Sequence, residues 1–200
     1  MPKHLTTLRV FLGTRTVANY PIIETEFNKA KTVKADIDEH IDKLYELALE
    51  CDHIVEGGVR YVVSTWAFLL GCASRGGIVV SYCYNMLPEI QRALDICAAE
   101  GVKWEFHDGD WLQQTIPETD LLFIDTNHEF WQLTAELSRH APKARKYIVM
   151  HDTESFRDVG ADGKRPGMWQ AVQNFVDQGK WRIKAHYPHQ NGLTILERVA

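Results

Sequence analysis

Apolar and polar residues follow two rhythms along most of this 200-residue chain. Short apolar or β-branched runs bounded by turn-forming residues predict strands over 53–57, 76–84, 102–110, 120–125, 145–152, 180–187 and 193–199. Apolar residues three or four positions apart predict helices over 36–52, 64–74, 87–101, 128–141 and 168–179. Strands and helices alternate from residue 53 onward, which is typical of a parallel sheet with helices on both faces.

The C-terminal segment departs from this alternation. Only the turn 188–192 separates the last two predicted strands, so they must be antiparallel. We therefore predict an α/β fold, with a Rossmann-like, doubly wound, seven-stranded and mostly parallel sheet that ends in an antiparallel hairpin. Residues 1–35 show no sustained period, although 8–13 could form a short strand. They are interpreted as an N-terminal extension to a domain that spans residues 36–200.

Composition and charge argue against a nucleic-acid-binding, membrane-spanning or secreted protein. The chain is 45% hydrophobic and 24% charged, with 22 basic and 27 acidic residues and a net charge of −5. This balance, without a long basic run, disfavours nucleic-acid binding. No apolar segment reaches the ~18 residues of a membrane span, and the start of the sequence lacks the apolar core of a signal peptide. We therefore expect a cytoplasmic protein, whose four cysteines are reduced and mostly buried.

Acidic and polar residues stand where three of the predicted strands end. Glu56 ends the first strand together with two glycines, Asp125 ends the fourth, and His151 and Asp152 end the fifth. These three strands are neighbours in the usual doubly wound order. Their carboxyl ends should therefore meet at one crevice, which is where ligands bind in such sheets.

Several short motifs, in this order, resemble one protein family. "VEGGVR" at 55–60, Gly109-Asp110 after the third strand, "FIDTNH" at 123–128 and "IVMHDT" at 148–153 resemble class I S-adenosylmethionine-dependent methyltransferases. The closest branch is that of the metal-assisted O-methyltransferases similar to macrocin O-methyltransferase and the so-called cephalosporin hydroxylases. The resemblance covers roughly residues 36–199. It implies transfer of the methyl group of S-adenosylmethionine to a hydroxyl of a small molecule or sugar.

The resemblance also implies a set of cofactor-binding residues. Glu56 and Gly58 would line the methionine end, and the hydroxyls that open the next helix would bond its carboxylate or simply cap the helix. Asp110 would bond the adenine amino group, while Trp111 would lie beside the ring or in the core. The complete set is Glu56, Gly58, Ser64, Thr65, Cys83, Asp110, Trp111 and Asp125.

The family pattern further implies a divalent cation, with Mg²⁺ favoured, held by Asp125 and Asp152. Two carboxylates held close repel each other unless a cation or proton joins them, and hard oxygen ligands suit Mg²⁺. His151 is either a third ligand or a packed strand-end histidine. His128 is the candidate general base, with a solvated histidine at a helix start as the alternative. Catalysis is thus expected from Asp125 and His128.

Two positions depart from the family pattern. Val62 stands where many such enzymes have glycine, and a β-branched residue is poorly tolerated at positive φ. The loop could still work if residue 62 already lies in the first helical turn. Cys83 stands where an acid usually bonds both ribose hydroxyls, and a thiol is a poor substitute. Asn127 is a milder departure, since it loses a charge but keeps hydrogen-bonding capacity.

Two functions remain open at this point. One is a methyltransferase acting on a small molecule; the other is a non-catalytic protein that uses the crevice or the extension to bind a partner. Paired acids at adjacent strand ends favour the enzyme, because a binding module has no need of them. A dinucleotide-binding dehydrogenase is rejected, since "EGGVRYVV" is not GxGxxG. Acceptor specificity is expected from residues 1–35 and the loop 153–167, and the extension is compatible with a homodimer.

Overall fold

The computed structural model describes residues 19–199 of the chain. The short strand predicted at 8–13 lies outside the described residues. Within residues 19–199, no helix combines the length and the apolar character that a membrane crossing requires.

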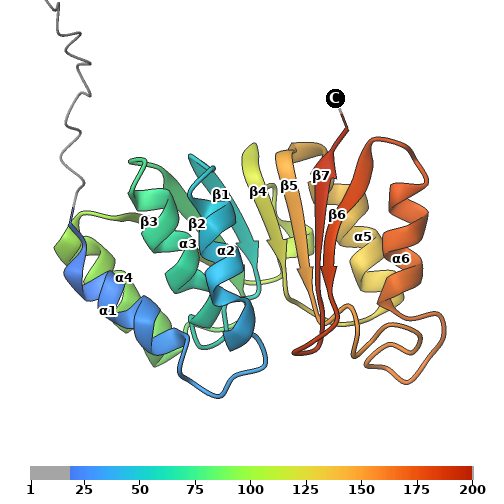
Figure 1. Cartoon of the computed structure of the whole chain (residues 1–200), viewed down its shortest axis with the longest axis horizontal. Helices are drawn as coiled ribbons and strands as arrows, with labels where there is room; N and C mark the ends of the chain where they lie inside the picture. Colours follow the sequence, from blue (N-terminus) through green and yellow to red (C-terminus); the bar gives the residue numbers. More distant parts are fainter. Residues whose placement is uncertain (1–18, 200) are drawn as a thin grey trace, which may run out of the picture.

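A seven-stranded sheet forms the centre of the described part of the chain (Figure 1). Its spatial order is β3-β2-β1-β4-β5-β7-β6, and β7 runs antiparallel to both of its neighbours. The strands are β1 (His53–Gly57), β2 (Ile78–Cys83), β3 (Lys103–Asp108), β4 (Thr119–Ile124), β5 (Ala144–His151), β6 (Trp181–Tyr187) and β7 (Leu193–Arg198). The predicted doubly wound sheet with a C-terminal antiparallel hairpin is confirmed.

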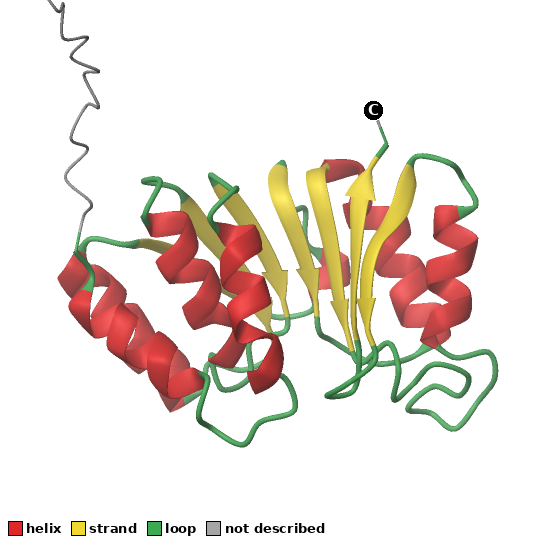
Figure 2. Cartoon of the chain, viewed as in Figure 1, coloured by secondary structure: helices red, strands yellow, loops and turns green. Residues whose placement is uncertain are grey.

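Among the described residues, six α-helices cover the two faces of the sheet (Figure 2). They are α1 (Pro21–Ala30), α2 (Ile41–Ala48), α3 (Val63–Ala73), α4 (Pro88–Glu100), α5 (Phe130–His140) and α6 (Met168–Val176). The first four pack into one buried cluster, and α5 and α6 pack into a second cluster on the opposite face. Successive residues of a strand enter alternate clusters: Ile54 faces the first and Val55 the second.

Helix α1 lies in the segment whose sequence shows no sustained period. Pro21 occupies its first turn, where a missing N–H costs nothing. Ile23, Phe27 and Ala30 fall at helical spacing and are buried against α3 and α4. One short buried stripe therefore adds this helix to the first core cluster.

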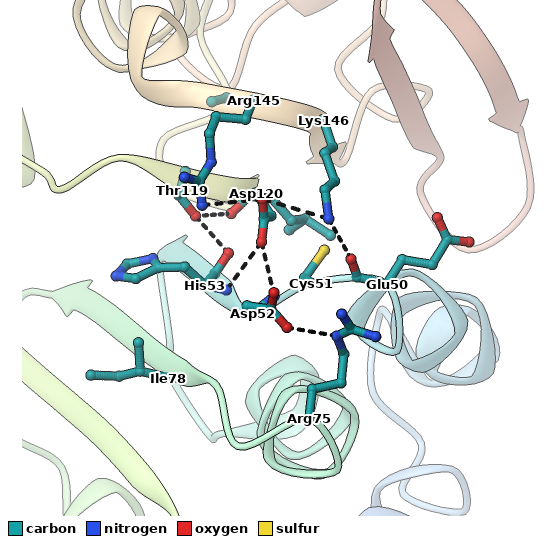
Figure 3. Close-up of polar contacts among 12 residues, drawn as sticks. Glu50, Cys51, Asp52, His53, Arg75, Ile78, Thr119, Asp120, Arg145 and Lys146 are labelled. Atoms are coloured by element: carbon teal, nitrogen blue, oxygen red, sulfur yellow. Dashed lines mark hydrogen bonds and ion pairs between the residues drawn. The ribbon is translucent and has the colours of Figure 1, made fainter. Parts of the chain in front are cut away.

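The amino and carboxyl ends of the parallel strands have different surroundings. At the amino ends of β4 and β5, the buried carboxylate of Asp120 accepts hydrogen bonds from the backbone N–H groups of Asp52, at 2.8 Å, and His53, at 3.4 Å. It also pairs with Arg145 at 3.2 Å and Lys146 at 3.6 Å (Figure 3). At the carboxyl ends lie the long loops that follow α1 and β5 (Figure 1).

Candidate active site

A crevice, here called the main crevice, opens at the carboxyl ends of β1, β2 and β4. Its lining residues are Gly58, Val59, Arg60, Tyr82, Cys83, Tyr84, Gly109, Asp110, Trp111, Asp125, Thr126, Asn127 and Gln132. Five of the residues predicted at the cofactor belong to this set, namely Gly58, Cys83, Asp110, Trp111 and Asp125. Glu56, Ser64 and Thr65 do not line it.

A second hollow, here called the side pocket, adjoins the main crevice. It shares Val59, Arg60 and Asp125 with the main crevice, and its outer wall is the loop segment 33–37. Tyr61 contributes an aromatic ring that is 58% exposed. The two hollows therefore meet at Asp125.

Glu56 is enclosed by hydroxyl groups. Its carboxylate accepts hydrogen bonds from Ser64 Oγ at 2.7 Å, Thr65 Oγ1 at 2.9 Å and Ser81 Oγ at 2.8 Å, and no part of the residue is exposed. Burial raises the pKa of Glu56 to about 7, although the three hydroxyl donors lower it. The Ser64 and Thr65 hydroxyls are thus bonded to Glu56 and do not cap α3, which has no side-chain cap among the described residues.

The glycines after β1 are required by the packing of the protein itself. Gly58 has φ +90°, and a Cβ there would lie 1.9 Å from the carbonyl oxygen of Asp125. A Cβ on Gly57 would lie 2.6 Å from the ring of Trp111. Only glycine lets the ends of β1 and β4 approach this closely.

Val62 immediately precedes α3 in a left-handed conformation, with φ +66°. The condition under which the loop could still work, that residue 62 lies in the first helical turn, is not met, because the helix begins at Val63. A non-glycine residue in this region stores strain of about 1–3 kcal/mol. The Val62 side chain is 1% exposed and packs in the first core cluster, so it lines neither the main crevice nor the side pocket.

Trp111 is both a core residue and a wall of the main crevice. It is 4% exposed, packs over Gly57 and donates its indole N–H to Glu136 Oε1 at 2.8 Å. Glu136 is fully buried and also accepts from Gln132 at 2.8 Å; burial raises its pKa. Sequence reasoning missed Glu136, since an acid in the middle of a predicted helix gives no functional signal. Asp110, beside Trp111, accepts the backbone N–H of Leu112 at 3.0 Å.

Four side chains meet beyond the ends of β4 and β5. His128 Nε2 lies 3.4 Å from Asp125 Oδ1 and 2.9 Å from Asp152 Oδ2. His151 Nδ1 lies 3.5 and 3.1 Å from the same two oxygens. The structure therefore brings together the predicted cation ligands Asp125, Asp152 and His151, together with the candidate base His128.

The charges of this cluster are strongly coupled. Burial lowers the pKa of His128, but its contacts with the two carboxylates outweigh burial and raise the pKa to about 9. The same opposing causes raise the pKa of His151 to about 10. The histidines in turn lower the pKa values of Asp125 and Asp152 against the effect of burial. Without a cation, the two carboxylates therefore favour the protonated form of both imidazoles, which disfavours His128 as a proton acceptor.

The loop at the end of β5 is shaped by backbone strain. Asp152 has φ +60°, a conformation that aspartate tolerates better than most residues. The resulting turn places its carboxylate against both histidines. The His128 ring stacks on Phe156, with 4.8 Å between ring centroids and 13° between planes.

Taken together, the strand order, the final hairpin and the crevice at the carboxyl ends define the fold of class I S-adenosylmethionine-dependent methyltransferases. No protein-family model matches the sequence, and no curated protein sequence matches it. The likeness is to solved structures, so it is carried by the fold.

Three of these structures illustrate the likeness. The methyltransferase PaMTH1 of Podospora anserina, bound to SAH, has 16% identity and a TM-score of 0.62, over 90% of this chain and 88% of that one. The O-methyltransferase of Bacillus cereus, in complex with SAH, has 14% identity and a TM-score of 0.63, over 88% and 91%. The O-methyltransferase TomG of Streptomyces achromogenes, in complex with SAM, has 16% identity and a TM-score of 0.63, over 88% and 90%.

Proposed function

We propose that this protein is an S-adenosylmethionine-dependent O-methyltransferase that acts on a hydroxylated small molecule or sugar. One observation carries this proposal: the crevice at the ends of β1, β2 and β4 meets a second pocket at Asp125, and His128 contacts the carboxylates of both Asp125 and Asp152. The fold supports the same function, because PaMTH1, the B. cereus enzyme and TomG bind SAH or SAM on this fold.

In the proposed complex, the methyl donor occupies the main crevice. Asp110 bonds the adenine amino group, Cys83 lies beside the ribose, and the methionine end lies along Gly58. Glu56 takes no part in direct contact, because its hydroxyl partners enclose it. It acts by joining β1, β2 and the first turn of α3 beneath the donor.

The acceptor would enter through the side pocket and reach Asp125. Val59 and Tyr61 offer apolar contact there, and Arg60 offers a positive charge. Methyl transfer from a sulfonium is an in-line displacement, so the main contribution of the protein is to align donor and acceptor. The loop that contains Val33 and Asp36 forms the outer wall and thus selects the acceptor.

The residues present fit a divalent cation, because two carboxylates converge with a fully buried histidine nitrogen that has no aligned hydrogen bond among the described residues. Asp125, Asp152 and His151 would hold the ion. A bound cation lowers the pKa of a coordinated hydroxyl, which supplies the nucleophile at neutral pH. Without it, protonated His128 offers only a hydrogen bond or a positive charge to the acceptor.

Cys83 keeps a second candidate function open. A non-catalytic protein with this fold would have no use for a charged ribose ligand, and the partly exposed thiol lies where that ligand is expected. The acidic pair at Asp125 and Asp152 favours the enzyme, since a binding role does not require it.

The decisive experiment is calorimetric titration with S-adenosylmethionine and with S-adenosylhomocysteine, each with and without a divalent cation. Binding of both ligands, weakened by Asp110→Ala, is the expected result. Asp177→Ala is the matched control, because this exposed aspartate follows α6 away from the crevice. Absence of heat for both ligands at several hundred micromolar would exclude the methyltransferase and leave the non-catalytic function.

A further inference from the structure

Four donor atoms face one another beyond the carboxyl ends of β4 and β5. Asp125 Oδ1 and Asp152 Oδ2 both lie near His128 Nε2, at 3.4 and 2.9 Å. The same two oxygens both lie near His151 Nδ1, at 3.5 and 3.1 Å. Each imidazole therefore presents one nitrogen to both carboxylates, and the two imidazoles reach them from different segments of the chain.

The protonation of His151 is constrained by its second nitrogen. The side chain is fully buried, and Nε2 lies 3.2 Å from the backbone carbonyl oxygen of Gln190. A carbonyl only accepts, so Nε2 carries the hydrogen, and Nδ1 in the neutral ring points a lone pair at two carboxylate oxygens. Nδ1 has no aligned hydrogen bond among residues 19–199. Histidines that bind metals commonly donate their other N–H to a carbonyl in this way.

The donor atoms of Asp125, His128 and Asp152 all lie within 4.8 Å of one another, and His151 Nδ1 adds two further close contacts with the carboxylates. Ligands about 2.0–2.2 Å from a common ion lie about 2.8–3.6 Å apart at angles between octahedral and tetrahedral values. The four measured nitrogen–oxygen separations run from 2.9 to 3.5 Å. Asp125, whose side chain is 25% exposed, forms the side of the cluster that opens to the main crevice.

We propose that Asp125, Asp152, His128 and His151 form a mixed nitrogen and oxygen site that selects a first-row transition ion such as Zn²⁺ or Co²⁺ over Mg²⁺. Imidazole suits these ions, whereas Mg²⁺ demands octahedral oxygen ligands and gives up its water reluctantly. The catalytic meaning of the site rests on the proposed function, but ion binding does not. In this arrangement His128 is an ion ligand and not the general base.

The test measures ion binding to the metal-free full chain, in the absence of any methyl donor. Zn²⁺ is titrated in competition with a chromophoric chelator, Mg²⁺ is titrated by calorimetry, and Co²⁺ is followed by its visible absorption. One Zn²⁺ per chain should bind at least ~1,000-fold more tightly than Mg²⁺, following the preference of nitrogen-containing sites. Co²⁺ should develop visible bands on binding.

Two variants assign the binding to this cluster. His128→Gln and His151→Gln should each weaken Zn²⁺ binding by at least ~10–100-fold, because even outer residues of metal sites have effects of this size. His107→Gln is the matched control, since this half-exposed histidine of β3 lies across the sheet from the cluster and should leave the affinity unchanged. Circular dichroism checks each variant, and His128→Gln suffices if the buried His151→Gln does not fold.

Three outcomes would overturn the proposal: similar affinities for Zn²⁺ and Mg²⁺, loss of affinity in the control alone, or Zn²⁺ binding that both cluster variants leave intact. The last would show that surface histidines bind the ion. Binding of S-adenosylhomocysteine to the same samples separates this proposal from the proposed function. Intact ion selectivity without S-adenosylhomocysteine binding contradicts only the function, and the reverse result contradicts only the ion site.

Discussion

Strand β4 has a buried aspartate, Asp120, at its second residue and a partly exposed one, Asp125, just beyond its last residue, and the two have different partners. Asp120 accepts two backbone N–H groups and pairs with Arg145 and Lys146 (Figure 3). Asp125, at the carboxyl end of the same strand, faces a second carboxylate, that of Asp152, and two imidazoles.

The difference shows that burial alone does not identify a functional acid. The partners of Asp120 are backbone amides and permanently charged side chains, so its charge is balanced in every state of the folded protein. The charge around Asp125 is balanced only while the histidines hold protons or an ion replaces them. An acid with exchangeable partners is suited to ligand chemistry, whereas one with permanent partners stabilises the sheet.

The largest effect is expected when both acids of the cluster, Asp125 and Asp152, are replaced. Asp125→Ala combined with Asp152→Ala should abolish ion binding and any metal dependence of methyl transfer, with a loss of activity of about 100-fold or more. Transfer is followed as release of S-adenosylhomocysteine in a screen of hydroxylated acceptors, with and without chelator. Metal dependence that survives in the double variant would refute the assignment of these two acids.

Glu56 provides an intermediate case, a buried acid whose partners are fixed but neutral. Its pKa in the folded protein, about 7, lies above the usual glutamate value of 4.5, so the folded state keeps a proton that the unfolded state releases. The stability from this group is fully present below pH 4.5 and is lost as pH rises through about 7. The expected loss is about 3 kcal/mol.

Glu56→Gln should remove this loss, because glutamine stays neutral and can still bond Ser64, Thr65 and Ser81. Free energies of unfolding measured by urea denaturation from pH 5 to 8 provide the comparison. Wild type should become less stable relative to the variant as pH rises. A constant difference across this range would show that Glu56 does not change protonation on unfolding.

An acid introduced at the carboxyl end of β2 tests whether the ribose of S-adenosylmethionine can act as the partner of a carboxylate in the main crevice. Cys83→Asp places a carboxylate at the end of β2, in the wall of the main crevice. A charge-assisted bond to ribose should tighten S-adenosylmethionine binding by about 10–100-fold. Cys83→Ser is the matched control and should have little effect. Unchanged affinity in Cys83→Asp would mean that the ribose lies elsewhere.

Most of the fold follows from local patterns in the sequence. The run Leu121–Ile124 is entirely apolar because both faces of β4 are covered, and this signal identifies a central strand. Helix α1 escapes prediction because its buried stripe, Ile23, Phe27 and Ala30, spans only two turns. The exposed Ile22 beside it further obscures the period. A stripe this short becomes visible only against the core that it covers.

The residues of the candidate site can be predicted from the sequence, but the groups that hydrogen-bond them cannot. Acids at strand ends are readable because the carboxyl ends of parallel strands meet. The enclosure of Glu56 depends on the pairing of β1 with β2, which places Ser81 directly opposite. The carbonyl that orients His151 belongs to Gln190, in the distant hairpin turn. Such contacts depend on strand register and loop placement, which no local pattern specifies.

The smallest effect is expected at the amino end of β4, where replacing Asp120 should change stability and not ligand binding. Asp120→Ala leaves the backbone N–H groups of Asp52 and His53 without their acceptor, which costs about 1–3 kcal/mol. A chain of this size should then melt about 2–10 °C lower by calorimetry. Arg145→Ala is the matched control and should cost less than about 1 kcal/mol, because its side chain is half exposed. Binding of S-adenosylhomocysteine and of ions should be unchanged in both variants. If Asp120→Ala instead weakens ion binding as strongly as loss of Asp125, the two ends of β4 are not independent, and the distinction between permanent and exchangeable partners fails.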